Sequence, residues 1–266
     1  MNMRINIYGS TGVIGCKSLS LIDKYFPNIK VNLLCANSNY KLLIRQCNIF
    51  KPKYIYINDY NHYLNLKTIL NNKTKVLNYA ELLKYLKNSK SDLSILAVSG
   101  YKSLNYLDHI INNSDNVGIV SKEAIVSAGH IFKTKKFFNK INIFPLDSEH
   151  YSLYDLFVNG FNKNNIKNII LTASGGPFHT KKFNDLNNVT FKQAIKHPKW
   201  KMGYKNSIDS ATLVNKCLEV IEAHYLFDIP YNKIKVLIHP EAIVHSIIQN
   251  CNYTSNMNLF KNDMDI

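Results

Sequence analysis

Two carboxylates stand two residues apart in the segment IFPLDSEH, residues 143–150. Asp147 and Glu149 follow an apolar run that predicts a buried strand, and in an extended backbone the side chains at i and i+2 point to the same side. Carboxylates that close repel each other unless a proton or a cation lies between them. A polar turn in which Asp147 or Ser148 caps the next helix explains the same residues. For this segment taken alone, that plainer interpretation is favoured.

A second group of polar side chains lies in a predicted long helix near residues 209–226. Asn215 and Glu219 are four residues apart and share a helix face, and Lys216 lies three residues before Glu219. A surface Lys–Glu pair on an amphipathic helix is the ordinary explanation. The functional hypothesis is that Glu219 joins the two carboxylates of the first segment as a third oxygen ligand. An all-carboxylate set suits Mg²⁺ or Mn²⁺ far better than zinc.

Two further positions could contact an anionic substrate. In the same predicted helix, Ser207 or Asp209 can cap the start, which leaves Ser210 near the positive helix end, a suitable place for a phosphate. Ser174 opens the turn SGGP at the end of a predicted strand. That turn is either a plain connection or a loop that contacts substrate.

A basic segment, HPKWKMG at residues 197–203, carries the single tryptophan of the chain. An exposed Trp200 in a flexible basic loop suggests a lid that closes over an anionic substrate. Alternatively, Trp200 anchors a core and His197 is an ordinary surface histidine. His245, which stands among apolar neighbours, is interpreted as a structural histidine rather than a ligand.

The sequence GSTGVIG at residues 9–15 follows the first predicted strand and opens the first predicted helix. Its glycines permit a tight turn, close approach of the backbone to a diphosphate, and tight packing of helix on sheet. The helix N-terminus supplies N–H groups for the anion, so we expect a dinucleotide here. The second predicted strand ends without an acidic residue, in Asn37, Ser38 and Asn39. These neutral residues disfavour the ribose clamp typical of NAD and mildly favour NADP.

The elements that must position these residues alternate in the first half of the chain. Strands are predicted at residues 4–8, 31–36, 54–57, 93–98, 117–120 and 141–144, with helices at 12–25, 40–50, 80–86 and 122–138. This alternation predicts a parallel sheet with helices on both faces. The fold class is therefore α/β, with a Rossmann-like NADPH-binding domain over residues 1–146.

The second half has a different pattern. Strands are predicted at residues 168–172, 235–238 and 242–249, before and after the long helix. We expect an α+β catalytic and dimerisation domain over residues 147–266, with an antiparallel sheet as the dimer surface. Residues 254–266 show no capped end and no closing apolar element, which indicates a loose tail or a chain that once continued.

Composition narrows the class of protein. The net charge is +15, but the lysines are scattered among many Asn and Ile residues, so we expect no nucleic-acid partner and only a modest attraction for phosphorylated substrates. Apolar runs are strand-sized, which predicts no membrane segment. The five cysteines have no metal or disulfide spacing and favour a reducing, cytosol-like compartment. A cytoplasmic location is expected, with a plastid-type organelle as an alternative.

Taken in order, the motifs GSTGxIG, SKE, PLDSEH, SGGPF, HPKWKMG, DSAT…NKxLE and IHPExxxHS resemble the 1-deoxy-D-xylulose 5-phosphate reductoisomerase family. The similarity runs from Arg4 to about Met264. The resemblance implies conversion of this phosphorylated sugar to 2-C-methyl-D-erythritol 4-phosphate, with NADPH and Mg²⁺ or Mn²⁺, in isoprenoid-precursor synthesis. It also implies a homodimer and, in the family, a further C-terminal helical domain that this sequence lacks.

The resemblance implies a role for each matching residue. The implied metal ligands are Asp147, Glu149 and Glu219. The implied substrate contacts are Lys122, Ser148, Glu149, Ser174, His197, Trp200, Ser210, Asn215, Lys216 and Glu219, of which Lys122, Glu149, His197 and Lys216 are the catalytic group. The implied cofactor contacts are Gly9, Thr11, Gly12, Val13, Ile14, Asn37, Ser38, Asn39, Ser121, Glu123, Met202 and Gly203. Ser121 stands where the family motif has Asn.

Two other interpretations stay open at this point. One is another two-domain NADP-linked reductase, which would need a catalytic Cys or a paired-His motif in place of the carboxylates. The other is a decayed paralogue that binds nucleotide or phosphosugar without turnover.

Overall fold

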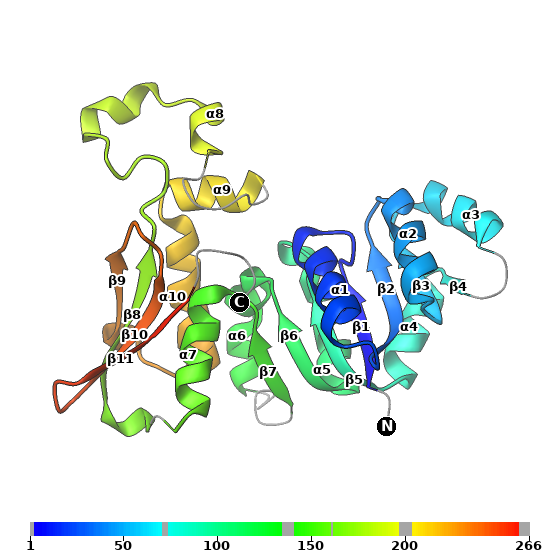
Figure 1. The fold of residues 1–266 in the computed structure, drawn as a ribbon, viewed down its shortest axis with the longest axis horizontal. Coiled ribbons are helices and arrows are strands. Elements are labelled where there is room, and N and C mark those ends of the chain that lie inside the picture. Colours follow the sequence, from blue (N-terminus) through cyan, green and yellow to red (C-terminus); the bar gives the residue numbers. More distant parts are fainter. Residues whose placement is uncertain (1–2, 71–73, 135–140, 161, 197–203, 261–266) are drawn as a thin grey trace. The chain divides into compact units, whose positions relative to one another are not determined.

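The computed structural model describes residues 3–70, 74–134, 141–160, 162–196 and 204–260. It divides into two compact units, Met1–Phe144 and Pro145–Ile266, called here the N-terminal unit and the C-terminal unit (Figure 1). The sequence placed this division two residues later.

The N-terminal unit is built on a seven-stranded sheet in the order β4-β3-β2-β1-β5-β6-β7. The pairings among the first six strands are parallel, as the alternating pattern predicted. The strands are β1 (Arg4–Tyr8), β2 (Lys30–Ala36), β3 (Tyr54–Ile57), β4 (Lys75–Leu77), β5 (Ser91–Leu96), β6 (Ser114–Ile119) and β7 (Asn142–Pro145). The sequence analysis did not predict β4, which is only three residues long.

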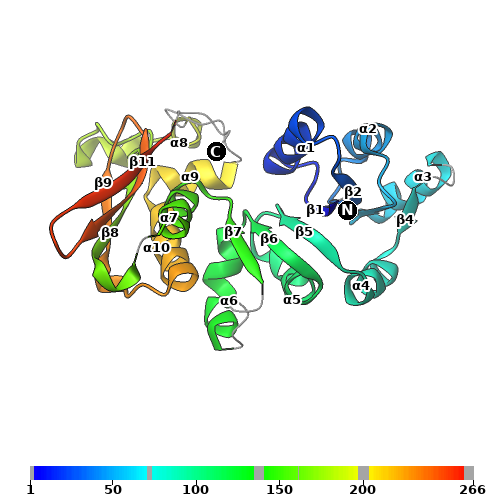
Figure 2. The same cartoon turned by 60° about the horizontal axis from the view of Figure 1, so that its bottom comes forward.

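Helices cover both faces of this sheet (Figure 2). On one face lie α1 (Val13–Tyr25), α2 (Tyr40–Phe50) and α3 (Tyr60–Ile69), whose apolar side chains share one buried core with β1, β2 and β3. On the other lie α4 (Tyr79–Asn88), α5 (Leu104–Asn113) and α6 (Lys122–Thr134). The predicted α/β class is confirmed for this unit.

The order of the strands marks one position as special. From β1 the chain builds outward through β2, β3 and β4, then returns to the other side of β1 and builds outward through β5, β6 and β7. In open α/β sheets, ligands bind at this switch point, beyond the carboxyl ends of the strands. The glycine-rich segment at residues 9–15 follows β1 directly and therefore lies there.

The C-terminal unit contains a four-stranded sheet in the order β11-β10-β8-β9. Two helices, α7 (Ser148–Val158) and α10 (Val214–Phe227), pack on it through a core that includes Leu153, Ile169, Ala223 and Ile248. The strands are β8 (Ile166–Ala173), β9 (Ile234–Ile238), β10 (Val244–Asn250) and β11 (Ser255–Leu259). Two short helices, α8 (Phe191–Ala194) and α9 (Tyr204–Ala211), lie between β8 and α10 in the chain.

Two predictions for the sheet of this unit are wrong. The sheet is mixed, because β8 pairs parallel with β9 and antiparallel with β10. Of the two interpretations of residues 254–266, the loose tail is wrong for Ser255–Leu259, which form β11 and pair antiparallel with β10. A tight turn makes this possible: Thr254 donates its backbone N–H to Asn252 Oδ1, and Tyr253 adopts a φ of 66°. The turn reverses the chain and brings a weakly apolar segment into register.

The predicted single helix near residues 209–226 is also wrong. The structure has two helices, α9 and α10, which are separated at Leu213, whose φ of 61° lies in the left-handed region. Leu213 occupies the N-cap of α10, so neither Ser207 nor Asp209 caps that helix. Ser210 consequently lies near the C-terminal end of α9 rather than in the first turn of α10.

Among the described residues, no helix combines the length and the apolar character needed to cross a bilayer.

Candidate active site

Helix α7 carries the first two acidic residues. Asp147 occupies the N-cap of α7, yet among the described residues its carboxylate makes no capping hydrogen bond. Glu149 lies in the first turn. Both residues follow strand β7, as predicted, but the expectation that they stand in one extended segment is wrong, because the backbone turns into a helix at Ser148. The two carboxylates still converge, and the side chain of Asp147 is not used for capping.

Helix α10 supplies the other half of the cluster. Asn215, Lys216 and Glu219 share one face, as their spacing predicted. Asn215 Nδ2 and Lys216 Nζ both donate to the Glu219 carboxylate, and Lys216 Nζ also donates to Glu149 Oε1 at 2.8 Å. Lys216 and Glu219 are buried, so the pair is not the surface ion pair of the ordinary explanation.

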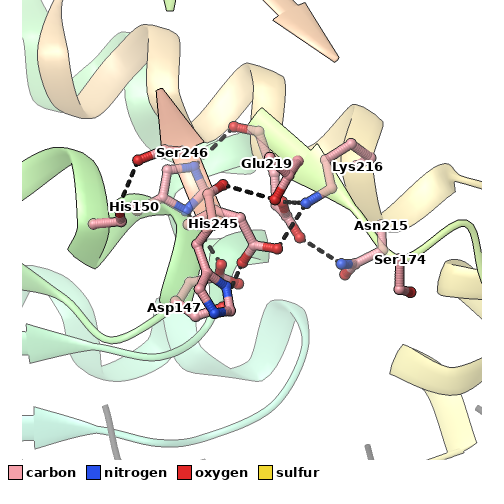
Figure 3. Close-up of polar contacts among 12 residues, drawn as sticks. Asp147, His150, Ser174, Asn215, Lys216, Glu219, His245 and Ser246 are labelled. Atoms are coloured by element: carbon pink, nitrogen blue, oxygen red, sulfur yellow. Dashed lines mark hydrogen bonds and ion pairs between the residues drawn. The ribbon is translucent and has the colours of Figure 1, made fainter. Parts of the chain in front are cut away.

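The three carboxylates meet in space, and Figure 3 shows two of them, those of Asp147 and Glu219. One oxygen atom from each of Asp147, Glu149 and Glu219 lies within 4.8 Å of the other two. Figure 3 shows Lys216 and Asn215 reaching Glu219 from one side. Ser148 Oγ donates to Glu149 Oε2 at 2.6 Å. The sequence predicted this grouping from segments about seventy residues apart.

The charges in this cluster oppose one another. Burial, together with the charges of Glu219 and Asp147, raises the pKa of Glu149 to about 7, although Lys216 acts in the other direction. For Lys216, burial lowers the pKa, but Glu149 and Glu219 outweigh it and raise the pKa above its usual value. Lys216 therefore stays cationic, while the carboxylates lack enough positive charge around them.

A second buried group lies beside the first and shares Asp147 with it. His150 Nδ1 is 3.3 Å from Glu222 Oε2 and 3.5 Å from Asp147 Oδ1, and His150 Nε2 is 2.9 Å from the carbonyl oxygen of Glu219. Both ring nitrogens thus face acceptors, which requires two donors and hence an imidazolium. Burial lowers the pKa of His150, but Glu222 and Asp147 outweigh it and raise the pKa to about 9.

The balance of charge tests whether a divalent cation fits. Four carboxylates stand against two cationic side chains, which leaves a formal excess of two negative charges in a buried site. Mg²⁺ and Mn²⁺ take oxygen ligands at about 2.1 Å, so ligand atoms on opposite sides of the ion lie roughly 4.2 Å apart. The observed spacing needs little adjustment, and a single divalent ion would neutralise the cluster.

The predicted substrate loop is positioned by two glycines. Gly175 and Gly176 have φ values of 85° and 70°, which favour glycine. A Cβ on Gly176 would lie 2.5 Å from the carbonyl oxygen of Ser210, so its absence lets the loop that follows Ser174 pack against the end of α9. Ser174 Oγ accepts the N–H of Gly176 at 3.4 Å. Ser174 and Ser210 are thereby placed on neighbouring segments.

The remaining residues that the sequence singled out are His245, Lys122 and the segment that contains His197 and Trp200. His197, Trp200, Met202 and Gly203 fall outside the described residues. Lys122, the first residue of α6, is buried in the N-terminal unit. His245 lies on β10 with its ring 5.6 Å from that of Phe260, and burial followed by the charge of Lys216 lowers its pKa. Because His245 lies beside the carboxylate cluster (Figure 3), its assignment as a structural histidine stays a prediction.

The predicted cofactor loop has the geometry of a strand–turn–helix phosphate site. Gly9 has a φ of 85°, and a Cβ there would lie 2.4 Å from the carbonyl oxygen of Ala97. A Cβ on Gly15 would lie 2.3 Å from the carbonyl oxygen of Gly9. Gly12 is the N-cap of α1 and has no side chain, so it leaves the N–H groups of Val13 and Ile14 uncapped. Thr11 lies in the turn between Gly9 and Gly12.

The other predicted cofactor residues have local roles in the described structure. Asn37, Ser38 and Asn39 are exposed after β2, and Asn39 caps α2 by accepting the N–H of Leu42 at 3.2 Å. Ser121 Oγ donates to Glu123 Oε2 at 2.9 Å and is buried. These placements leave their contacts with a cofactor as predictions.

Three polar residues beside the sites were given no role by the sequence analysis. His150 and Glu222 adjoin the carboxylate cluster, and Gln46 contacts the glycine loop. Glu222 and Gln46 offered one signal in the sequence, since each occupies the apolar face of its helix, where a polar side chain must find a buried partner.

A glycine loop at the switch point of a parallel sheet and a buried carboxylate cluster in an α+β unit together define a two-unit, nucleotide- and metal-dependent enzyme. The sequence profile of 1-deoxy-D-xylulose 5-phosphate reductoisomerase matches residues 5–129, and the profile of the C-terminal domain of that enzyme matches residues 143–227. The chain belongs to the 1-deoxy-D-xylulose 5-phosphate reductoisomerase family.

Individual relatives agree with this assignment. The chain is 38% identical to the 1-deoxy-D-xylulose 5-phosphate reductoisomerase of Pelagibacter ubique, over 99% of this chain and 68% of the relative. It is 42% identical to that of Clostridium tetani, over 92% of this chain and 65% of the relative. The chain thus spans about two thirds of the length of these relatives.

Solved structures show the same fold. A DOX-P reductoisomerase in complex with NADPH, fosmidomycin and magnesium matches with a TM-score of 0.88 and 30% identity, over 98% of this chain and 67% of the other. The enzyme from Zymomonas mobilis in complex with NADPH also matches with a TM-score of 0.88 and 30% identity, over 99% of this chain and 68% of the other. The combination of a Rossmann-like unit with an α+β unit is confirmed.

Proposed function

We propose that the chain converts 1-deoxy-D-xylulose 5-phosphate to 2-C-methyl-D-erythritol 4-phosphate, using NADPH and Mg²⁺ or Mn²⁺, in isoprenoid-precursor synthesis. The observation that carries the proposal is the cluster of the buried Glu219 with the partly buried Asp147 and Glu149, in which one oxygen atom from each lies within 4.8 Å of the other two. Family membership supplies the reaction, and solved relatives bind NADPH and magnesium.

Asp147, Glu149 and Glu219 would hold the cation. When bound, the ion would polarise the carbonyl group of the substrate as a Lewis acid. Lys216 stays cationic between Glu149 and Glu219, and Asn215 fixes the second carboxylate oxygen of Glu219. These two donors restrict the rotamers of the carboxylates before substrate arrives, which reduces the reorganisation that the reaction requires.

The phosphate of the substrate would bind at the serines of the C-terminal unit. Ser174 and Ser210 lie on segments that pack together through Gly176. Hydroxyl groups held by rigid neighbouring segments can accept a phosphate far from the reacting carbons and so fix the orientation of the sugar. Lys122, His197 and Trp200 complete the set of substrate contacts in this proposal.

NADPH would bind the glycine loop of the N-terminal unit. The N–H groups at the start of α1 would receive the diphosphate. The neutral residues Asn37, Ser38 and Asn39 would receive the ribose and its 2′-phosphate, because no carboxylate stands there to repel the phosphate.

The two rival interpretations find less support. A different NADP-linked reductase would not need three converging carboxylates with a buried lysine between them. A decayed, non-catalytic paralogue would not be expected to keep a buried cluster with excess negative charge, because such a cluster costs stability when no cation fills it.

The proposal is tested by NADPH oxidation after addition of 1-deoxy-D-xylulose 5-phosphate, measured with Mg²⁺, with Mn²⁺ and with a chelator. We expect turnover only with a cation present. Equal turnover in the chelator would remove the proposed mechanism, and tight ligand binding without turnover would favour the decayed paralogue.

We also propose that the chain forms a homodimer through the sheet of its C-terminal unit. The edge strand β9 exposes three consecutive apolar residues, Val236, Leu237 and Ile238, each more than 40% exposed. An exposed apolar edge strand is an association surface. Light scattering of the chain should give a dimer, and Leu237→Lys should shift it to monomer; a wild-type monomer would contradict this proposal.

A reducing compartment, such as the cytoplasm, is the proposed location. All five cysteines are unpaired, and Cys35 and Cys47 are buried in the core of the N-terminal unit.

A further inference from the structure

Gln46 is a polar side chain on the core-facing side of α2. Its neighbours on that face, Leu43 and Cys47, are buried in the main core of the N-terminal unit, and Gln46 itself is only 5% exposed. A buried amide costs free energy unless its donor and acceptor find partners. An apolar residue would be the ordinary choice here, so the contacts of this amide indicate what it does.

Those contacts go to the glycine loop. Gln46 Nε2 donates to the carbonyl oxygen of Ser10 at 2.8 Å, and Gln46 Oε1 accepts from Ser10 Oγ at 2.9 Å. Gln46 Nε2 also lies 3.8 Å from the Sγ of Cys16 in α1. Ser10 is fully buried, whereas Gly12 and Val13, which follow it in the loop, are exposed. The amide therefore holds both the backbone and the side chain of one loop residue.

The backbone of the loop is fastened to β2 as well. The N–H groups of Gly9 and Ser10 both donate to the carbonyl oxygen of Cys35, at 2.9 and 2.8 Å. Cys35 and Gln46 lie on either side of the exposed segment Asn37–Asn39 along the chain. The loop is thus hydrogen-bonded both to strand β2 and to helix α2.

We propose that Gln46 is a positioning residue for the dinucleotide, acting through Ser10 to hold the loop that receives the diphosphate. Gln46 does not face the cofactor. It couples the glycine loop, which would receive the diphosphate, to α2, which begins directly after the proposed ribose-binding segment. The two segments that would bind the cofactor are thereby held in one rigid arrangement. This inference rests on the proposed function insofar as the loop binds NADPH.

The test is Gln46→Met, which keeps the length of the side chain and removes both hydrogen bonds. We expect about tenfold weaker NADPH binding, because two buried hydrogen bonds and their unsatisfied partners are involved. In the cofactor-free protein, we expect faster amide exchange at Thr11–Ile14. The kcat at saturating NADPH and the affinity for Mn²⁺ should not change.

Two further variants separate positioning from stability. Thr74→Val removes a buried hydrogen bond of 2.8 Å to the carbonyl oxygen of Pro52 in the same unit, away from the loop, and should leave NADPH binding unchanged. Ser10→Ala removes only the hydroxyl contact and should weaken binding less than Gln46→Met. The double variant with Ser10→Ala and Gln46→Met should bind NADPH only slightly more weakly than Gln46→Met alone, since the Ser10 hydroxyl has then already lost its acceptor.

The outcomes distinguish this inference from the proposed function. If Gln46→Met and Thr74→Val have the same NADPH affinity and the same loop exchange as the parent, the positioning role is wrong. If Gln46→Met does not fold, the effect of Ser10→Ala on binding and exchange decides in the same way. If the parent protein does not bind NADPH, the proposed function fails. Faster amide exchange of the loop in Gln46→Met would still show that Gln46 holds the loop in place.

Discussion

The two candidate sites of this chain depend on different chemical groups. In the C-terminal unit, charged side chains on α7 and α10 are buried together, and their positions depend on one another's charges. In the N-terminal unit, the cofactor loop relies on backbone N–H groups, on glycines without a Cβ, and on one buried amide. The first site is specified by electrostatics and the second by shape.

This difference explains how each site should respond to change. In the carboxylate cluster, a substitution that preserves shape but removes a charge alters every neighbour, because buried charges interact strongly. In the loop, side chains that face away from the cofactor matter only if they move the backbone. Isosteric changes of charge should therefore disturb the carboxylate cluster most, and small changes of volume should disturb the loop most.

The largest effect is expected for Glu219→Gln. The amide retains the shape but loses one proposed ligand charge, and it leaves Lys216 facing a neutral group. Loss of several kcal/mol of electrostatic stabilisation corresponds to a decrease in kcat of about 10³-fold or more. Steady-state kinetics and Mn²⁺ titration measure it, while NADPH binding should stay within about twofold.

The matched control is Asp155→Asn. Asp155 lies on α7 beyond the first turn that carries Glu149, and its carboxylate accepts a hydrogen bond of 2.8 Å from Asn258. Its activity should remain close to that of the parent. Retained activity in Glu219→Gln would show that this carboxylate is not a ligand.

A smaller effect is expected for Glu222→Gln. Glu222 balances the charge of His150, which also faces Asp147. With a neutral amide at position 222, His150 would draw the Asp147 carboxylate toward itself and away from the cation. Groups that orient metal ligands typically contribute 10- to 100-fold to metal affinity, so we expect a loss of about that size in a calorimetric Mn²⁺ titration.

Ser152→Ala provides the comparison for Glu222→Gln. It removes a buried hydrogen bond of 2.7 Å between α7 and Ser246 without changing any charge, and Mn²⁺ affinity should be unaffected. Equal Mn²⁺ affinities in the two variants would mean that His150 and Glu222 only fill space.

In the loop, Gly15→Ala should weaken NADPH binding by about tenfold. The added Cβ would lie 2.3 Å from the carbonyl oxygen of Gly9 and 2.7 Å from the Cα of Ser10, so the backbone must move. Overpacking of this kind also lowers the free energy of unfolding by about 1–3 kcal/mol. Fluorescence titration with NADPH and thermal unfolding measure both effects, and the Mn²⁺ affinity should be unchanged.

Gly12→Ala sharpens the comparison within the loop. Its Cβ would lie 3.3 Å from the carbonyl oxygen of Gly9, a tight contact but a milder one than those expected in Gly15→Ala, so a smaller loss of stability is expected. Equally weakened NADPH binding with this smaller loss of stability would then report close approach of the cofactor itself. If Gly15→Ala binds NADPH as tightly as the parent, shape does not specify this site.

The sequence predicted the regular parts of the fold well where local signals were strong. The bounds of β1, β3 and α2 were predicted to the residue, since short β-branched runs and a capped amphipathic helix are locally encoded. The break between α9 and α10 was missed because a leucine in the left-handed region has no local signal. Strand β11 was missed because pairing with β10, not its own composition, makes it a strand.

The candidate site shows the same limit. Asp147, Glu149 and Glu219 were predicted from residue type and spacing, and the structure brings them together, while their role as ligands stays a prediction. The sequence could not show that His150 and Glu222 form a second buried pair against Asp147. Such a pair is visible only when two helices pack, because neither helix contains both partners.

The smallest effect is expected at Asn39, where the loss of a helix cap has to be distinguished from the loss of a cofactor contact. Asn39 caps α2, and Asn78 caps α4 through hydrogen bonds with Glu81 that form a capping box. Replacing either by Ala removes a cap and should cost about 1 kcal/mol of stability. Only Asn39 lies in the proposed ribose segment, so Asn39→Ala should also weaken NADPH binding a few-fold, and Asn78→Ala should not.

Asn39→Asp decides between the two roles of Asn39, because aspartate caps a helix as well as asparagine does. Stability should therefore be restored in Asn39→Asp. The new carboxylate would repel a 2′-phosphate, so binding of NADPH should fall while binding of NADH should not. NADPH binding in Asn39→Asp as tight as in the parent would place the ribose elsewhere and leave Asn39 as a cap alone.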